Sequence, residues 1–193
     1  MGARAVFLVG FMASGKSTVG QELARRLGWD FVDLDSRIEA RERKSITEIF
    51  RDVGEPGFRR AESNALQHLT QSLERNSVVA LGGGAFAQEN NRTLLWNWPS
   101  VFLNAPVEEL WRRSLADGVE RPLGKARDQF ARLHEERLPG YRQATITVET
   151  AGRDVVAICT EIERALQFPT QAGGGRQDSA ASGSPNSRSG ESQ

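Results

Sequence analysis

The sequence predicts an α/β fold in which helices cover both faces of a five-stranded parallel sheet, a three-layer αβα sandwich. Short apolar runs, typical of buried parallel strands, alternate along the chain with longer amphipathic segments. The chain has 193 residues, of which 38% are apolar and 26% charged, and this is the composition of one globular domain. Alternation of strands and helices favours parallel pairing, because each strand then returns through a helix.

The expected strands are the apolar runs Ala5 to Val9, Asp30 to Leu34, Ser77 to Leu81, Ser100 to Leu103 and Thr145 to Val148. The expected helices have apolar residues at helical spacing and are Lys16 to Leu27, Ser36 to Val53, Phe58 to Leu73, Gln88 to Trp98, Val107 to Ala116, Lys125 to Leu138 and Arg153 to Leu166. Gly28 is placed to end the first helix. Ser36 with Glu39, and Ser45 with Glu48, have the spacing of a capping box.

The domain is expected to span residues 1–168. The remaining segment, 169–193, contains no Val, Ile, Leu, Met, Phe, Trp or Tyr, so it cannot bury enough apolar surface to offset the entropy of ordering and is predicted to be disordered. Inside the domain, residues 117–126 carry Gly118, Pro122 and Gly124 among charged residues and lack periodicity. This segment is expected to be a mobile lid.

Composition excludes several classes of protein. The 25 Lys and Arg residues balance 25 Asp and Glu residues, so a net positive field for nucleic acid is not expected. A single cysteine and two histidines provide neither an internal disulfide nor a Cys/His zinc site. Cys159 lies in the apolar phase of the last helix and is expected to be a core residue.

No run approaches the length of a membrane span. The apolar stretch Ala5 to Ala13 after Arg4 imitates a short signal peptide, but Gly10 interrupts it and no credible cleavage site follows. We therefore expect a cytoplasmic protein, with no membrane partner, that acts as a monomer on small molecules.

A phosphate-binding motif follows the first expected strand. Residues 10–17 read GFMASGKS and fit G-x-x-x-x-G-K-[ST], with an apolar strand before and a helix after, as a P-loop requires. The glycines let backbone N–H groups and the helix N-terminus face an anion. Lys16 would then contact the β and γ phosphates, and Ser17 would offer its hydroxyl to Mg²⁺. A P-loop NTPase-type fold that binds a nucleoside triphosphate is the resulting prediction.

Asp33 and Asp35 stand two residues apart at the end of the second strand, at the carboxyl edge where ligands of open parallel sheets bind. One carboxylate could hold the water shell of the metal, and the other a substrate hydroxyl. The alternative is that Asp35 is only a helix cap before Ser36.

Two further features suggest an acceptor site. Arg59 and Glu62 are three residues apart on a helix, where a solvated surface ion pair is the alternative reading. Gly82, Gly83 and Gly84 follow a strand at the carboxyl edge, where missing side chains permit close approach of a ligand. The base-reading N-K-x-D motif and the D-x-x-G loop of guanine-nucleotide switches are both absent from the sequence.

Six motifs in order give the chain a resemblance to the shikimate kinase family. They are Gly10 to Thr18, Asp33 to Asp35, Gly54-Glu55 with Phe58 to Glu62, Gly82 to Gly84, Arg121 to Leu123 and Arg137 to Tyr141. The resemblance implies phosphorylation of the 3-hydroxyl of shikimate by ATP with Mg²⁺, a step toward chorismate and the aromatic amino acids.

The resemblance also implies a role for each matching residue. Lys16, Asp35 and Arg121 would be catalytic. The substrate would contact Asp35, Arg59, Gly82, Gly83, Gly84 and Arg137. ATP would contact Ala13, Ser14, Gly15, Lys16, Ser17, Thr18, Arg121 and Arg153, and the metal would contact Ser17 and, through water, Asp33.

Three residues depart from the family pattern. Ala13 replaces a frequent glycine and is expected to have little effect, whereas Gly124 and Gly140 replace bulkier residues and are expected to loosen the lid and alter affinity. Two other functions remain open at this stage: another small P-loop kinase, such as a gluconate kinase, and a non-catalytic ATP-binding regulator.

Overall fold

The computed structural model describes residues 4–116 and 126–168 of the chain. Its centre is a five-stranded sheet in the order β2-β3-β1-β4-β5, in which every neighbouring pair is parallel. The strands are β1 (Ala5–Val9), β2 (Asp30–Asp33), β3 (Ser77–Ala80), β4 (Ser100–Asn104) and β5 (Ile146–Glu149). The predicted fold class is thereby confirmed.

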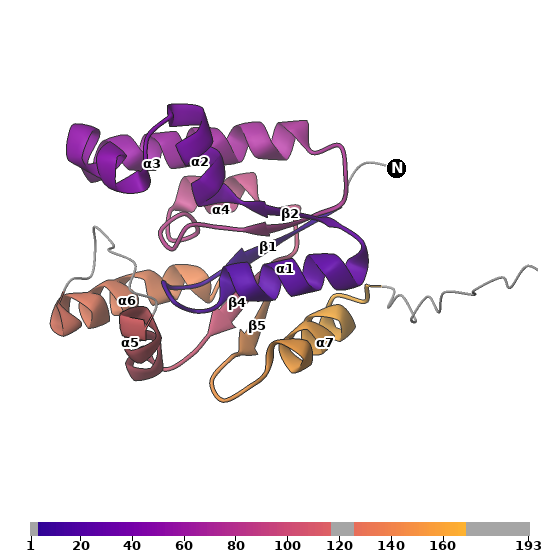
Figure 1. Ribbon diagram of the computed structural model, residues 1–193. Coiled ribbons are helices and arrows are strands. Elements are labelled where there is room, and N and C mark those ends of the chain that lie inside the picture. The colour runs from indigo at the N-terminus through magenta and orange to yellow at the C-terminus, as the bar shows by residue number, and fades with distance from the viewer. Residues whose placement is uncertain (1–3, 117–125, 169–193) are drawn as a thin grey trace, which may run out of the picture.

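Helices cover both faces of the sheet (Figure 1). They are α1 (Lys16–Leu27), α2 (Leu34–Glu42), α3 (Ile46–Ser72), α4 (Glu89–Leu94), α5 (Val107–Ala116), α6 (Arg127–Tyr141) and α7 (Val155–Ala165). The alternation of side chains along β1 explains the two layers, because Phe7 and Val9 point to one face while Val6 and Leu8 point to the other.

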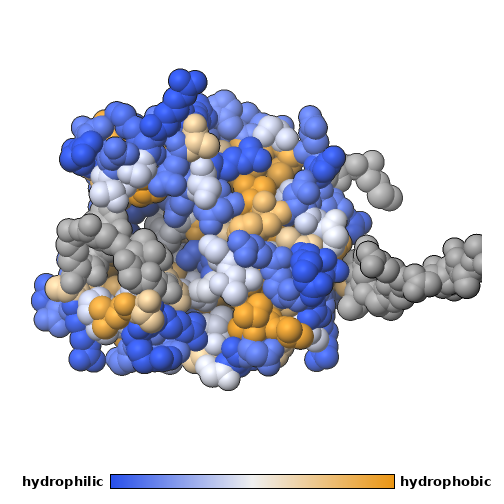
Figure 2. Space-filling view, viewed as in Figure 1, coloured by the Kyte–Doolittle hydropathy of each residue, from blue (hydrophilic) through white to orange (hydrophobic). Residues whose placement is uncertain are grey.

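Each face of the sheet has its own apolar core. On one face, Phe7 packs with Leu66 of α3 and Tyr141 of α6. On the other, Leu8 packs with Leu23 of α1 and Ile162 of α7. Figure 2 shows that polar side chains cover most of the outer surface in that view, with apolar side chains gathered in a few separate patches. The described residues contain no helix that is long and apolar enough to cross a bilayer.

The chain between β2 and β3 differs from the expected helices. The expected helix Ser36 to Val53 is divided between α2 and α3, because Arg43 adopts a left-handed conformation and ends α2. The helix α3 then continues to Ser72, with a kink at Gly54, where φ is 65° and ψ is −178°. A glycine is required there, since other residues rarely adopt this conformation. The kink separates two helical segments that the sequence pattern also kept apart.

Two of the three expected caps are confirmed. Gly28 adopts a left-handed conformation after α1, and Ser45 with Glu48 forms the reciprocal capping box of α3. The capping box of Ser36 and Glu39 is wrong. Helix α2 begins two residues earlier, and Asp33 caps it by accepting hydrogen bonds from the backbone N–H groups of residues 35 and 36.

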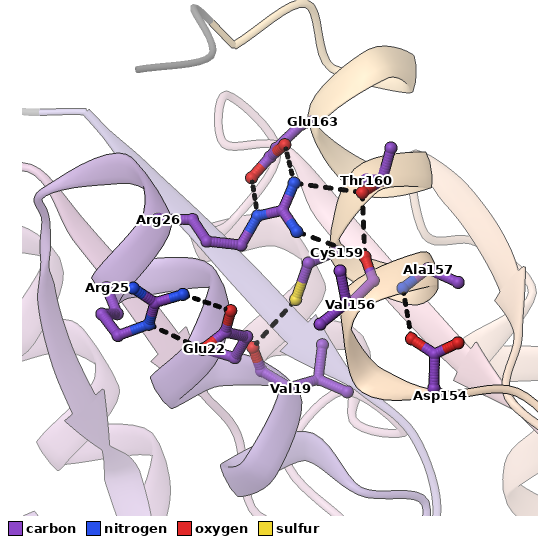
Figure 3. Close-up of polar contacts among 10 residues, drawn as sticks. All are labelled: Val19, Glu22, Arg25, Arg26, Asp154, Val156, Ala157, Cys159, Thr160 and Glu163. Atoms are coloured by element: carbon purple, nitrogen blue, oxygen red, sulfur yellow. Dashed lines mark hydrogen bonds and ion pairs between the residues drawn. The ribbon is translucent and has the colours of Figure 1, made fainter. Parts of the chain in front are cut away.

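A buried ion pair joins α1 and α7, the two helices that cover the same face of the sheet (Figure 3). The guanidinium of Arg26 in α1 donates to both carboxylate oxygens of Glu163 in α7, at 2.6 and 2.7 Å, and also to Thr160 Oγ1 at 3.0 Å. Glu163 is only 5% exposed. Beside it, burial raises the pKa of the Cys159 thiol to about 12, as expected for a cysteine in the core.

Replacing Glu163 should destabilise the fold much more than replacing the neighbouring Glu161. We expect Glu163→Ala to cost about 2–3 kcal/mol of unfolding free energy, because it leaves the partly buried Arg26 charge without its carboxylate. The control is Glu161→Ala, which removes an exposed ion pair with Arg153 and should cost less than about 1 kcal/mol. Urea unfolding of both variants measures the difference, and equal losses would contradict it.

Candidate active site

The P-loop occupies residues 10–15, between β1 and α1, and its backbone requires glycine at both ends. Gly10 has a φ of 148°, and a Cβ added there would lie 2.8 Å from the carbonyl oxygen of Leu103. Gly15 has a φ of 88° and stands at the N-cap of α1 without a side-chain cap. The N-terminus of α1 is therefore open toward the loop, as an anion site requires.

Lys16 and Ser14 complete the loop. The Nζ of Lys16 donates to the carbonyl oxygens of Gly10 and Phe11, at 3.0 and 2.8 Å, and lies 3.5 Å from Ser14 Oγ. The ammonium group thus lies within the curve of the P-loop. Ser14 is buried, whereas Ser17 and Thr18 are exposed at the start of α1.

Ala13 departs from its expectation. Its φ is 60°, in the left-handed region. The missing glycine at this position therefore does matter, because a residue with a Cβ is strained in this conformation by about 1 kcal/mol.

Ser17 and Asp33 form an oxygen-rich pair beside the P-loop. Ser17 Oγ donates to Asp33 Oδ2 at 3.1 Å, while the other oxygen of Asp33 caps α2. A hydroxyl and a carboxylate are ligands that suit Mg²⁺, which keeps water and phosphate oxygens as its remaining ligands. No group of three or more His, Cys, Asp or Glu side chains that could hold a metal occurs within residues 4–116 and 126–168. The donor set fits a metal shared with a nucleotide and not a cage made by the protein alone.

A pocket of about 110 Å³ lies next to the P-loop, and we call it the central pocket. Its polar lining includes Asp35, Arg59 and Arg137, and Met12 of the P-loop forms part of its wall. The complete lining is Met12, Asp35, Ile46, Phe50, Phe58, Arg59, Glu62, Gly82, Gly83, Gly84 and Arg137. The structure therefore brings together the predicted acceptor residues of four separate segments. Asp35 lies within α2 and does not cap it, so the alternative reading of Asp35 as a cap is wrong.

Arg59 and Glu62 are paired, as their spacing allows, but the pair is not a solvated surface contact. Arg59 Nη1 donates to Glu62 Oε2 at 2.8 Å, and Glu62 is fully buried. Burial raises the pKa of the Glu62 carboxyl, and the Arg59 guanidinium opposes this rise. Arg59 also donates twice to Glu55, at 2.9 and 3.2 Å. These contacts hold the guanidinium at the wall of the central pocket.

Two glycines of the triplet, Gly82 and Gly84, are needed for space. A Cβ on Gly82 would lie 2.5 Å from Asp35 Oδ1 and 2.8 Å from Glu62 Oε1. A Cβ on Gly84 would collide with the Arg59 guanidinium. Any side chain at either position would displace a charged group of the central pocket.

Helix α6 holds the middle glycine of the triplet. The carbonyl oxygen of Gly83 accepts hydrogen bonds from Arg137 Nη1, at 3.2 Å, and from the Tyr141 hydroxyl. Burial raises the pKa of Tyr141 to about 12, so this hydroxyl remains a donor at neutral pH. The sequence showed Tyr141 as part of a motif but gave it no role, because its partner lies 58 residues away.

Gly140, for which the sequence predicted a looser lid and altered affinity, lies at a tightly packed position. It is buried in the last turn of α6, and a Cβ there would lie 3.0 Å from Ala87 Cα and 3.3 Å from Arg92 Nη1. The glycine thus permits close packing of α6 against the segment after the glycine triplet.

Two further residues, Arg153 and Arg121, were predicted to contact ATP. Arg153 follows β5, and its guanidinium donates to Glu149 O, Ala157 O and Glu161 Oε2, within its own loop and α7. Of the lid predicted at 117–126, residues 117–125 with Arg121 and Gly124 lie outside the described residues, as does the tail at 169–193.

Comparison with known proteins agrees with this geometry. A family model described as shikimate kinase matches residues 12–167 of the chain. A shikimate kinase from Persephonella marina is 43% identical over 160 residues, which cover 82% of this chain and 96% of that protein. The chain belongs to the shikimate kinase family. A family member from Thermus thermophilus is 41% identical over 173 residues, covering 88% of this chain and 93% of its own.

Solved structures support the same family. The structure of shikimate kinase from Acinetobacter baumannii in complex with shikimate superposes with a TM-score of 0.79 at 35% identity, covering 86% of this chain and 93% of that one. A gluconokinase from Sinorhizobium meliloti has a TM-score of 0.58 at 20% identity, which shows a shared fold alone. The chain is accordingly an enzyme of the kinase class, and the alternative of a non-catalytic regulator is not supported.

Relief of the strain at Ala13 should stabilise the protein. We expect Ala13→Gly to raise the unfolding free energy by about 0.5–1 kcal/mol, since glycine adopts a φ of 60° without a steric penalty. The control is Ala40→Gly on the exposed side of α2, which should lower it by about 1 kcal/mol. Thermal or urea unfolding of both variants measures whether the unfolding free energy rises or falls. A loss of stability in Ala13→Gly would contradict the proposed strain.

Proposed function

We propose that the chain transfers the γ-phosphoryl group of ATP to the 3-hydroxyl of shikimate, giving shikimate 3-phosphate and ADP. The observation that carries this proposal is the central pocket, where a carboxylate and two guanidinium groups meet beside the P-loop. The reaction would supply the route to chorismate and the aromatic amino acids.

The carboxylate of the substrate would bind to Arg59 and Arg137. A guanidinium binds a carboxylate through two parallel hydrogen bonds and stays charged at all relevant pH values. Both side chains are restrained before substrate arrives, Arg59 by Glu55 and Glu62, and Arg137 by the carbonyl of Gly83. The recognition of an acid therefore needs little reorganisation of the protein.

Asp35 would orient the attacking hydroxyl and accept its proton. The hydroxyl oxygen then forms a bond to the γ-phosphorus while the bond from this phosphorus to the β,γ-bridging oxygen breaks, and the electron pair leaves with ADP. Phosphoryl transfer depends mainly on such positioning and on neutralising negative charge. Asp35 and Met12 line the same pocket, so the acceptor would lie next to the phosphate cradle.

The P-loop would hold ATP. Backbone N–H groups of Ala13 to Thr18 would face the phosphates, and Lys16 would add a positive charge close to them. Ser17 and, through water, Asp33 would hold Mg²⁺, which when bound supplies charge neutralisation to the β and γ phosphates. From the family resemblance, Arg121 would close over the phosphates and Arg153 would contact the adenine.

The proposal extends to the state of the protein in the cell. We propose that it acts as a monomer in the cytoplasm, where ATP is available. Light scattering on the purified protein should give the mass of one chain.

The acceptor is tested by a coupled ADP assay. ATP consumption should depend on shikimate and on Mg²⁺ together, and EDTA should abolish it. Gluconate and nucleoside monophosphates serve as controls: gluconate carries its carboxylate on an open chain, and a nucleoside monophosphate carries a phosphate in place of a carboxylate. Turnover of gluconate equal to that of shikimate would overturn the assignment of the substrate.

Loss of Arg59 should affect one substrate and not the other. We expect Arg59→Ala to raise KM for shikimate by about 100-fold, the effect of losing a charge-assisted contact of roughly 3 kcal/mol, with KM for ATP changed by less than about threefold. Arg60→Ala, an exposed neighbour on the same helix, is the matched control and should behave like wild type. Equal changes in both KM values for Arg59→Ala would argue against the assigned role.

A further inference from the structure

Gln88 is a polar residue close to the central pocket that no sequence motif includes. It precedes α4 at the N-cap position, is half-buried, and makes no side-chain cap there. Its Nε2 donates instead to Glu62 Oε2 at 3.0 Å. The residue at an N-cap is usually Ser, Thr, Asp or Asn, whose side chain accepts a hydrogen bond from the first turn of the helix. Gln88 does not stabilise α4 in this way, because its side chain is directed toward Glu62.

Glu62 Oε2 therefore receives two donors, Arg59 Nη1 and Gln88 Nε2. The other oxygen, Oε1, is buried beside Gly82 and has no hydrogen-bond partner among the described residues. A buried carboxylate with few donors depends strongly on each of them. Burial and the neighbouring Asp35 raise the pKa of Glu62, while Arg59 and Arg137 lower it.

The segment that carries Gln88 is held firmly. The amide of Asn91 donates to Ala85 O at 3.0 Å, and Arg92 Nη1 donates to the carbonyl oxygens of Phe86 and Ala87 at 3.0 and 2.7 Å. These contacts connect α4 to the residues just before Gln88. The amide of Gln88 is thus presented to Glu62 from a fixed backbone.

We propose that Gln88 is a positioning residue of the central pocket, whose amide holds the buried Glu62 carboxylate against Arg59 and thereby sets the direction in which the Arg59 guanidinium meets an acidic substrate. Only the last step, contact with the substrate, rests on the proposed function. Gln88 suits this role because it is a neutral donor. A Lys or Arg would compete with Arg59 for Glu62, and an Asp or Glu would repel it.

Gln88→Met tests the inference, because methionine keeps the length of the side chain and removes the donor. We expect KM for shikimate to rise about tenfold, with kcat and KM for ATP changed by less than about twofold, since a hydrogen bond to a charged group is lost. Gln88→Ala, which cannot clash, should give the same result. Gln67→Met on the exposed side of α3 is the matched control and should match wild type.

A second measurement does not depend on activity. The Glu62 carboxyl carbon is followed by NMR during a pH titration without substrate, and its midpoint should move up by about one pH unit in Gln88→Met, because the lost donor stabilised the charged form. The acid limb of kcat/KM for shikimate should move in the same direction. An unchanged Glu62 midpoint, or an unchanged KM for shikimate in both Gln88 variants, overturns the inference.

A double-variant experiment separates a role through Glu62 from a general loss of structure. In the Glu62→Gln background, Gln88→Met should have no further effect on KM for shikimate, whereas independent, additive effects would overturn the inference. Should the wild-type protein fail to phosphorylate shikimate, the proposed function fails, and the NMR titration still decides whether Gln88 controls Glu62.

Discussion

The structure depends on one geometric constraint: all five strands run in the same direction, so their carboxyl ends meet at one edge of the sheet. Segments far apart in the sequence leave the sheet there, among them the P-loop after β1, Asp33 at the end of β2 and the glycine triplet after β3. The P-loop and the central pocket can therefore lie side by side, although the segments that form them are far apart in the sequence. Helices pack on both faces of the sheet, and each face has its own apolar core.

The second constraint is electrostatic. Glu62 is fully buried and Arg137 is 7% exposed, and such charges cost free energy unless they are compensated. The fold compensates them locally, with Arg59 against Glu62 and the Gly83 carbonyl against Arg137. The same contacts restrain the groups that would bind an acid. Compensation of buried charge and preparation of the binding site are thus achieved by the same hydrogen bonds.

Much of the site was predictable because its signals are local. The spacing of Gly10, Gly15 and Lys16 specifies a P-loop, and the pair Asp33 and Asp35 follows an apolar strand toward the binding edge. The predictions were wrong where the local sequence allowed more than one structure. Ser36 and Glu39 have capping-box spacing, but Asp33 caps the helix because α2 begins two residues earlier. The strain at Ala13 likewise depends on the course of the whole loop, which its residue type does not reveal.

The sequence by itself determined the order of strands and helices, the phosphate cradle and the identity of the charged residues, because these depend on periodicity and on contacts between near neighbours. Only the tertiary structure decided that the Arg59 and Glu62 pair is buried, that Tyr141 holds Gly83 and that Gln88 reaches Glu62. The last two contacts join residues on different helices and loops, and the burial of the Arg59 and Glu62 pair within α3 depends on the elements packed around it. Their existence depends on how the helices pack across the sheet, and spacing along the chain carries no information about distances between such elements.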